Sequence, residues 1–384
     1  MNGTVLKRGD TWTVVIELAR DPVTGRRRQK WHGGFRTKKE AERARVQFLG
    51  KVLDGSYVEQ TRQTLRTHLD EWLKAIEPTV RPATFHSYER NLRLHVLPHL
   101  GHTRLQQIDP GTLNGLYAHL LTEGKASGAG GLSPRSVIYV HTILHRALKD
   151  AVRWGRLARN PGDAADPPKA DKAASKNINA WEASTLNSFL GKSKASRDRY
   201  YPAWHLLATT GLRRGEALGL RWSDLDLDTG TASIRQTVIA VNHAVEFGTP
   251  KTAKGRRQIA LDAGTVRALR DHRVSQLEER MLIGEGWDDH DLVSANVHGG
   301  PLHPERFSRE FDRRIQRWGL PRIRLHDLRH TWATLALQAG VHPKVVSERL
   351  GHSTISITLD TYSHVTPSMA SDAADLVAEL IRLG

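Results

Sequence analysis

The sequence predicts a multidomain protein with a small β-sheet-plus-helix domain at the N-terminus, an all-α domain, and a mixed, mainly α domain with a small antiparallel sheet. The 384 residues are enough for two or three domains. Strand-like segments rich in β-branched residues occur in a few places, whereas apolar residues at helical spacing dominate elsewhere. Residues 167–176 (PPKADKAASK) have the composition of a linker between the second and third domains.

The first domain is expected over residues 1–58. Thr11–Leu18 is β-branched and aromatic and predicts a strand, and Arg26–Phe35 predicts a second one. Thr37 is expected to cap a helix over Lys38–Leu53, because a glutamate three residues further on completes a capping box. The segment is therefore predicted to be a small sheet with one helix.

The charge of the chain is strongly basic, with 57 Lys and Arg against 41 Asp and Glu and a net charge of +16. This charge indicates a polyanion, most simply nucleic acid, although a solvated surface is the alternative. The charge density is highest in residues 1–58, with 13 Lys and Arg against 6 Asp and Glu. We expect the strands of this domain to contact DNA through Arg20, Arg26, Arg27, Arg28 and Lys30.

The second domain, residues 62–166, is expected to be all helical. Apolar residues recur at helical spacing from Leu65 to Ile76 and in three later stretches, near 84–96, 108–121 and 133–154. Ser133 followed by proline is a helix-start signal. No group of acidic and basic side chains in this domain suggests catalysis.

The third domain, residues 177–384, is predicted to be mixed, with helices dominating. Ser184 is expected to cap its first helix, and residues 200–210 form an apolar helix that ends at Gly211. Strands are expected at Thr231–Gln236 and Arg257–Leu261, and further helices near 263–281, 304–318, 327–339 and 343–350.

Several classes of protein are excluded by composition. The chain contains no cysteine, so it has no disulfide framework, thiolate zinc site, thiol nucleophile or cysteine-held iron–sulfur cluster. The N-terminus lacks the apolar stretch of a signal peptide, and no apolar run approaches the ~18 residues of a membrane span. We therefore expect a cytoplasmic protein without membrane association.

Two segments of the third domain place cations beside breaks in secondary structure. Arg213 comes directly after the helix-breaking Gly211, where its side chain can project into a cleft. Lys251 lies between the two expected strands, at what is predicted to be a hairpin tip, from which a lysine could reach a substrate. Lys254 is a rival in the same segment, but the Lys-Thr pair after Pro250 favours Lys251.

Two later segments carry imidazole and phenol groups. His326, Arg329 and His330 share one helix face through their i, i+3 and i+4 spacing, which suits a phosphate better than a metal because no third ligand pattern accompanies the histidines. His352 follows a helix expected to end at glycine, and Tyr362 comes ten residues later. No metal site is predicted.

Taken in order, these positions resemble the signature of the tyrosine recombinase (phage integrase) family, Arg…Lys…His-x-x-Arg…His/Trp…Tyr. The surrounding sequence segments TGLRRGEALGLRW, HDLRHTWAT and LGHSTISITLDTYSH also resemble those of this family. The resemblance covers the third domain closely. It implies a tyrosine recombinase fold, with residues 1–58 as an arm-type DNA-binding domain, 62–166 as a helical core-binding domain and 177–384 as the catalytic domain.

The resemblance also implies a reaction. The Tyr362 hydroxyl would attack a DNA phosphodiester and form a 3′-phosphotyrosyl intermediate, which retains the bond energy, so neither ATP nor a cofactor is expected. Arg213 and Arg329 would hold the negative charge of the transition state with planar guanidinium groups. No metal cage is expected. Tyr200 lies outside any matching context and is a weak rival for the nucleophile.

The remaining site residues receive supporting roles from the same resemblance. Lys251 would be the general acid that protonates the leaving 5′-oxygen. His326 would help to deprotonate Tyr362, and His352 would hydrogen-bond the phosphate. Glu216 matches an acidic family position that orients the pocket.

The expected function is integration, and excision, of a phage or mobile element. The expected partners are double-stranded DNA at attachment sites and three further copies of the chain in a homotetramer, with a host DNA-bending protein and an excision factor as further candidates. Alternatives are a chromosome- or plasmid-dimer resolvase, a catalytically silent DNA-binding regulator and a type IB topoisomerase; the filled chemical positions and the N-terminal domain disfavour them. Docking of the C-terminal segment within its own protomer or on a neighbour is left open.

Overall fold

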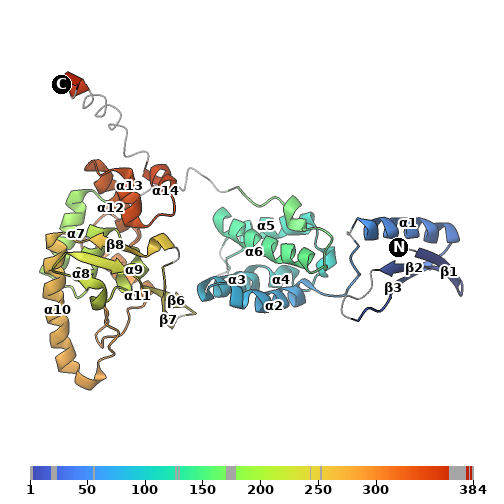
Figure 1. The fold of residues 1–384 in the computed structure, drawn as a ribbon, viewed down its shortest axis with the longest axis horizontal. Helices are drawn as coiled ribbons and strands as arrows, with labels where there is room; N and C mark the ends of the chain where they lie inside the picture. The colour runs from blue at the N-terminus through green and yellow to red at the C-terminus, as the bar shows by residue number, and fades with distance from the viewer. Residues whose placement is uncertain are drawn as a thin grey trace. The chain divides into compact units, whose positions relative to one another are not determined.

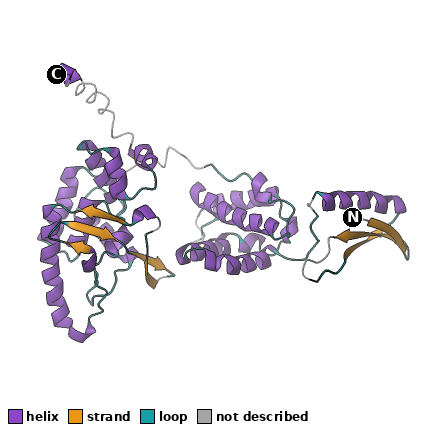
Figure 2. Cartoon of the chain, viewed as in Figure 1, coloured by secondary structure: helices purple, strands orange, loops and turns teal. Residues whose placement is uncertain are grey.

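The structure is a computed structural model that describes residues 3–18, 24–54, 57–125, 128, 130–169, 179–242, 244–250, 253–362, 378–379 and 381–382. The chain divides into two compact units, Met1–Asp171 and Lys172–Gly384. Figure 1 shows the order of the elements along the chain, and Figure 2 shows that helices predominate in both units.

The first unit begins with a three-stranded antiparallel sheet and one helix. The elements are β1 (Gly3–Arg8), β2 (Thr11–Leu18), β3 (Arg28–Phe35) and α1 (Lys38–Leu53), and the strand order is β1-β2-β3. Val14 and Ile16 of β2 are buried against Ala41 of α1, which explains the apolar pattern of this strand. Strand β1, before the first predicted strand, was not expected from the sequence.

The capping box of α1 is present as predicted. The Thr37 hydroxyl accepts a hydrogen bond from the backbone N–H of Glu40 at 3.2 Å, and the Glu40 carboxylate accepts one from the backbone N–H of Thr37 at 3.4 Å. Two of the otherwise unpaired N–H groups at the start of the helix are therefore satisfied.

The rest of the first unit is a helical bundle. Its helices are α2 (Leu65–Ile76), α3 (Pro82–His95), α4 (Leu97–Leu100), α5 (Pro110–Glu123) and α6 (Pro134–Arg153), with short 3₁₀ turns at Glu77–Thr79, Leu105–Gln107 and Pro161–Ala164. Apolar side chains from all five helices form one core. The Trp72 indole lies inside this core and donates a hydrogen bond to the Asp150 carboxylate at 2.8 Å, so its N–H is not left unpaired. Ser133 caps α6 and proline occupies its first turn, as predicted.

The second unit packs helices around a small sheet. Its helices are α7 (Ala183–Ala195), α8 (Tyr201–Thr210), α9 (Arg214–Leu218), α10 (Ala263–Ile283), α11 (Pro304–Arg317), α12 (Asp327–Gln338), α13 (Pro343–Leu350) and α14 (Ile355–Tyr362). One sheet has the order β4 (Leu225–Asp226), β5 (Thr231–Ile234), β8 (Arg257–Ala260), and β6 (Thr237–Val241) pairs with β7 (Ala244–Gly248). Trp181, Phe189, Trp204, Phe307 and Phe311 fill the core.

Two expectations about this unit are wrong. Ser184 is not the cap of α7; the cap position is Glu182, and Ser184 lies inside the first turn. The two expected strands, β5 and β8, pair with each other but are not joined by a simple hairpin, because the paired strands β6 and β7 lie between them in the sequence. Lys251 itself lies outside the described residues. The intervening hairpin of β6 and β7 was not recognised, since its strands follow β5 without a strong turn signal.

We predict that Leu144→Ala lowers the free energy of unfolding by about 2–5 kcal/mol, because Leu144 is fully buried in the helical bundle and truncation leaves a cavity. Chemical denaturation of the full chain measures the change. Leu94→Ala is the matched control, since Leu94 is 37% exposed and its loss should cost less than about 1 kcal/mol. Equal effects of the two substitutions would contradict the packing described.

Candidate active site

The first predicted arginine stands at a sharp break between α8 and α9. Gly211 ends α8 with a φ of 66°, in the left-handed region. A Cβ at this position would lie 2.8 Å from the Leu350 side chain and 2.9 Å from Trp332, so both conformation and space require glycine. The chain then turns and places Arg213 at the N-cap of α9, with 40% of its side chain exposed.

A buried carboxylate holds two guanidinium groups in place. Glu216 is 2% exposed and accepts hydrogen bonds from Arg213 (2.8 Å from Nη1 and 3.0 Å from the backbone N–H) and from Arg257 (2.9 and 3.3 Å from Nη2 and Nη1). Burial alone would raise the pKa of the Glu216 carboxyl. The hydrogen bond and charge of Arg257, together with the charge of Arg213, outweigh burial and lower this pKa.

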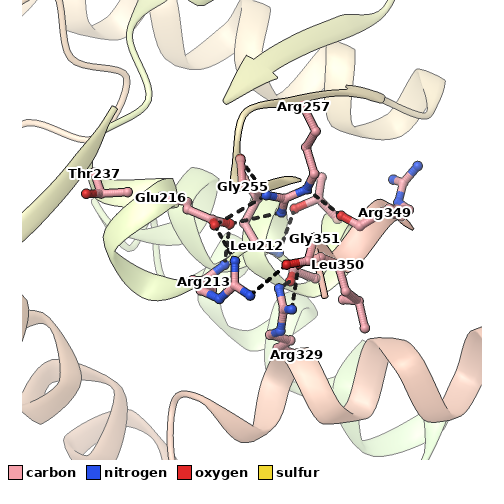
Figure 3. A network of polar contacts seen from close by, with 12 residues as sticks. Leu212, Arg213, Glu216, Thr237, Gly255, Arg257, Arg329, Arg349, Leu350 and Gly351 are labelled. Carbon is pink, nitrogen blue, oxygen red and sulfur yellow. Dashed lines mark hydrogen bonds and ion pairs between the residues drawn. The ribbon is translucent and has the colours of Figure 1, made fainter. Parts of the chain in front are cut away.

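The C-terminal end of α13 gathers three arginines by its backbone carbonyls (Figure 3). Arg213 donates to the Gly351 carbonyl at 3.1 Å, and Arg257 donates to the Arg349 carbonyl at 2.6 Å. Arg329 donates to the Leu350 carbonyl at 2.6 Å and to the Gly211 carbonyl at 2.8 Å. The last carbonyls of a helix lack intrahelical partners and carry partial negative charge, which suits cations.

The arginine cluster retains positive charge in spite of Glu216. Arg213, Arg257 and Arg329 surround this one carboxylate, so their local sum is positive. Burial and then the charge of Arg213 lower the pKa of Arg329 to about 9, which still leaves it protonated at pH 7. The arrangement is suited to an anion that approaches from the side of the partly exposed Arg213.

Two histidines near Arg329 are neutral at pH 7. Burial and then the nearby Arg329 and Arg213 lower the pKa of His352 to about 4, and its Nδ1 lies 2.8 Å from the Thr358 hydroxyl. Burial and then His330 lower the pKa of His326 to about 4. His326 stands at the start of α12, its ring perpendicular to that of His330 at a centroid distance of 5.4 Å.

Tyr362, the last residue of α14, lies against α12. Its side chain is 2% exposed, and its hydroxyl oxygen lies 2.7 Å from Nδ1 of His330. Burial raises the pKa of Tyr362 to about 12, although the charge of Arg329 acts in the opposite direction. The phenol is therefore protonated in this structure.

The structure brings together five predicted residues and one predicted support: Arg213, His326, Arg329, His352, Tyr362 and Glu216. Lys251 lies outside the described residues. Its rival Lys254 donates a hydrogen bond to the Ser353 carbonyl at 2.9 Å, beside His352. Tyr200 lies instead among the aromatic side chains of the core, 5.7 Å from Phe307 between ring centroids.

Two residues of the site were missed or left unassigned by the sequence analysis. Arg257 shares Glu216 with Arg213 and had appeared only as the start of a strand. His330 was placed on the correct helix face but received no role. The adjacent arginines at 256 and 257 signalled a basic segment, but which one turns inward depends on strand register.

The basic residues predicted for the N-terminal sheet are partly described. Arg26 and Arg27, just before β3, and Arg28, its first residue, are exposed. Lys30 forms an ion pair with Glu59, and Arg20 lies outside the described residues. In the described part of the chain, no cluster of three metal-binding side chains occurs and no helix is long and apolar enough to cross a membrane.

Comparison with known families agrees with this geometry. Residues 176–369, half of the chain, match the model of the phage integrase family, residues 5–52 match an arm DNA-binding domain, and residues 64–121 match the N-terminal SAM-like domain of phage integrases. The chain therefore belongs to the phage integrase family, the tyrosine recombinases, whose members carry out site-specific DNA recombination.

Named relatives span almost the whole chain. A XerC-like tyrosine recombinase from Caldanaerobacter subterraneus subsp. tengcongensis is 27% identical over 96% of both chains. The ICEBs1 integrase of Bacillus subtilis is 23% identical over 96% of this chain and 97% of its own. An integrase from Streptomyces ambofaciens is 29% identical over 91% of this chain and 88% of its own.

Solved structures confirm the fold class predicted from the sequence. The Tn1549 transposon integrase in complex with a circular intermediate DNA has a TM-score of 0.65, with 20% identity over 84% of this chain and all of its own. A lambda integrase tetramer bound to a Holliday junction has a TM-score of 0.56, with 18% identity over 91% of this chain and 95% of its own.

We predict that Glu216→Gln lowers the free energy of unfolding by about 3–5 kcal/mol at pH 7, because Arg257 keeps its charge and loses its buried partner. The folded-state pKa of Glu216 is depressed, so its contribution is complete above the ordinary carboxyl pKa of 4.5 and is lost as pH falls below it. Denaturation at several pH values should show the difference from wild type shrinking below pH 4.5.

The matched control is Asp228→Asn. Asp228 also pairs with an arginine, Arg270 at 2.7 Å, but 93% of its side chain is exposed. Its substitution should change stability by less than about 1 kcal/mol. If both substitutions lowered the free energy of unfolding by the same amount, burial of Glu216 would not add to the effect of its ion pair, which would contradict the prediction.

Proposed function

We propose that the protein cuts and rejoins DNA at specific sites through a 3′-phosphotyrosyl intermediate. The observation that carries this proposal is the convergence of Arg213 and Arg329 on the C-terminal end of α13, next to His352. Tyr362 lies beside α12, the helix that carries Arg329. A phosphodiester is the anion that such guanidinium and imidazole groups would recognise.

In this mechanism the Tyr362 oxygen attacks phosphorus and the 5′-oxygen leaves. Arg213 and Arg329 would stabilise the charge that grows on the non-bridging oxygens, and Glu216 would keep Arg213 oriented. Neutral His352 would donate an N–H group to the same oxygens, and the family resemblance gives His326 the removal of the Tyr362 proton. Lys251 would protonate the leaving 5′-oxygen as the general acid. The later attack of a 5′-hydroxyl on the phosphotyrosine rejoins the strands without ATP or a metal ion.

The role proposed for this reaction is integration, and excision, of a phage or mobile element. The match of residues 5–52 to an arm DNA-binding domain supports integration over dimer resolution. Residues 1–58 would bind arm sites, 62–166 would bind the crossover core and 177–384 would perform the chemistry. Four protomers would assemble on two attachment sites, with a host DNA-bending protein and an excision factor as further candidates.

We predict that wild-type protein forms a covalent adduct with a nicked suicide substrate that carries the crossover site, in buffer with EDTA. Tyr362→Phe should form none, because the phenyl ring keeps the packing but lacks the nucleophile. Denaturing electrophoresis with labelled DNA measures the adduct. Adduct in the Phe variant would contradict the nucleophile, and an absolute need for magnesium would contradict the metal-free mechanism.

We predict that the triple variant Arg26→Glu, Arg27→Glu, Arg28→Glu weakens binding to arm-type DNA sites and reduces the salt dependence of that binding by about one unit of slope per lost phosphate contact. Cleavage of an isolated core site should stay unchanged. Lys38→Glu, Lys39→Glu, Arg43→Glu is the matched control, since these exposed cations lie on α1 of the same domain. Equal loss of binding in both triple variants would contradict recognition through the strands.

A further inference from the structure

His330 is bound to the hydroxyl that the proposed function assigns as nucleophile. Its Nδ1 lies 2.7 Å from the Tyr362 oxygen and joins α12 to α14. The Tyr362 ring packs beside buried side chains of α12 and α13, namely Ala333, Leu337, Val346 and Leu350. The hydrogen bond therefore belongs to a packed interface between helices.

The other histidine of α12 does not make this contact. His326 stands one turn earlier, at the N-cap, and forms no side-chain hydrogen bond with another described residue. A general base has to lie within hydrogen-bond reach of the group that it deprotonates, about 2.6–3.2 Å between heavy atoms or through one water molecule. In this structure His330 satisfies that requirement and His326 does not.

We propose that His330 is the general base that removes the proton of Tyr362 during strand cleavage, in place of His326, which the family resemblance implies for this role. The proposal rests on the proposed function, because it assumes that Tyr362 attacks DNA. The Tyr362 O–H bond breaks and its proton moves to Nδ1 of His330, which becomes an imidazolium. The Tyr362 oxygen bonds to phosphorus, and the 5′-oxygen leaves with the proton of Lys251. In the rejoining step the imidazolium returns the proton to Tyr362.

The surroundings of His330 suit a base that starts neutral. Burial is the main cause that lowers its pKa; Arg329 and Arg324 act in the same direction, and Asp327 acts against them. His326 and His352 also face this region and are themselves neutral at pH 7. In the neutral tautomer that is protonated on Nε2, the lone pair on Nδ1 accepts the phenolic proton. An incoming phosphate adds negative charge nearby and favours the imidazolium that the transfer creates.

Single-turnover cleavage of the suicide substrate between pH 5.5 and 9 tests the assignment. His330→Asn places an amide oxygen where Nδ1 stands, so it retains a hydrogen-bond acceptor and removes the basicity. We expect a rate near pH 7 reduced by about 100-fold or more, consistent with loss of a general base. The rate should rise about tenfold per pH unit, since cleavage then depends on the ionised fraction of a phenol whose pKa is about 12.

Wild type and His326→Asn provide the comparison. The wild-type rate should reach a plateau at neutral pH and fall below pH 6.5, as His330 becomes protonated, because its pKa lies below this ordinary value. His326→Asn is the same substitution one turn away; it should lower the rate but retain the plateau. A wild-type cleavage rate that rises up to pH 9 without a plateau would overturn the assignment. This test uses only the wild-type protein, so it does not depend on whether a variant folds.

A DNA substrate with sulfur in place of the bridging 5′-oxygen separates acid from base. A thiolate leaves without protonation, so this substrate should restore cleavage by Lys251→Ala and leave His330→Asn slow. Restored cleavage of the sulfur-substituted DNA by His330→Asn would overturn the role of His330 but not the proposed function. A His330→Asn rate within threefold of wild type on ordinary DNA would have the same meaning. Absence of any adduct with wild type would overturn the proposed function and, with it, this assignment.

Discussion

The buried contact between Glu216 and two arginines is the interaction on which the rest of the site depends. A carboxylate that is 2% exposed is stable only when its oxygens are fully hydrogen-bonded, and here Arg213 and Arg257 supply those bonds. Because Arg213 is the N-cap of α9 and Arg257 is the first residue of β8, the same contact joins the start of a helix to the edge of a sheet. The Glu216 carboxylate thereby orients Arg213 and holds the start of β8 in place.

The carbonyl end of α13 extends this arrangement to the remaining arginine. Its carbonyls accept hydrogen bonds from Arg213, Arg257 and Arg329, which come from three different elements. Such an assembly needs close backbone approach, and Gly351 supplies it: a Cβ there would lie 3.0 Å from Arg257 and 3.1 Å from the Lys254 carbonyl. Hydrogen bonds to protein groups therefore hold the three guanidinium groups close together, an arrangement that suits electrostatic stabilisation of an anion.

The sequence predicted much of this structure because its signals were local. The capping box at Thr37, the glycine that ends α8 and the spacing of helices α10 to α13 each depend on neighbouring residues. The partnership of Arg257 with Glu216 and that of His330 with Tyr362 join residues 41 and 32 positions apart, and no local pattern encodes them. The sequence analysis expected the strands β5 and β8 but missed the hairpin of β6 and β7 that lies between them in the sequence. The order of the motifs predicted which residues form the site. Which of their side chains are in contact depends on tertiary packing.

The most direct test of the account is to identify the amino acid that becomes attached to DNA. Wild-type adduct on a suicide substrate would be digested with trypsin, and the DNA-linked peptide sequenced by mass spectrometry, with the linked DNA end determined on the same sample. The account predicts attachment through Tyr362 to a 3′-phosphate. Attachment through Tyr200 or any other residue, or to a 5′-phosphate, would contradict it.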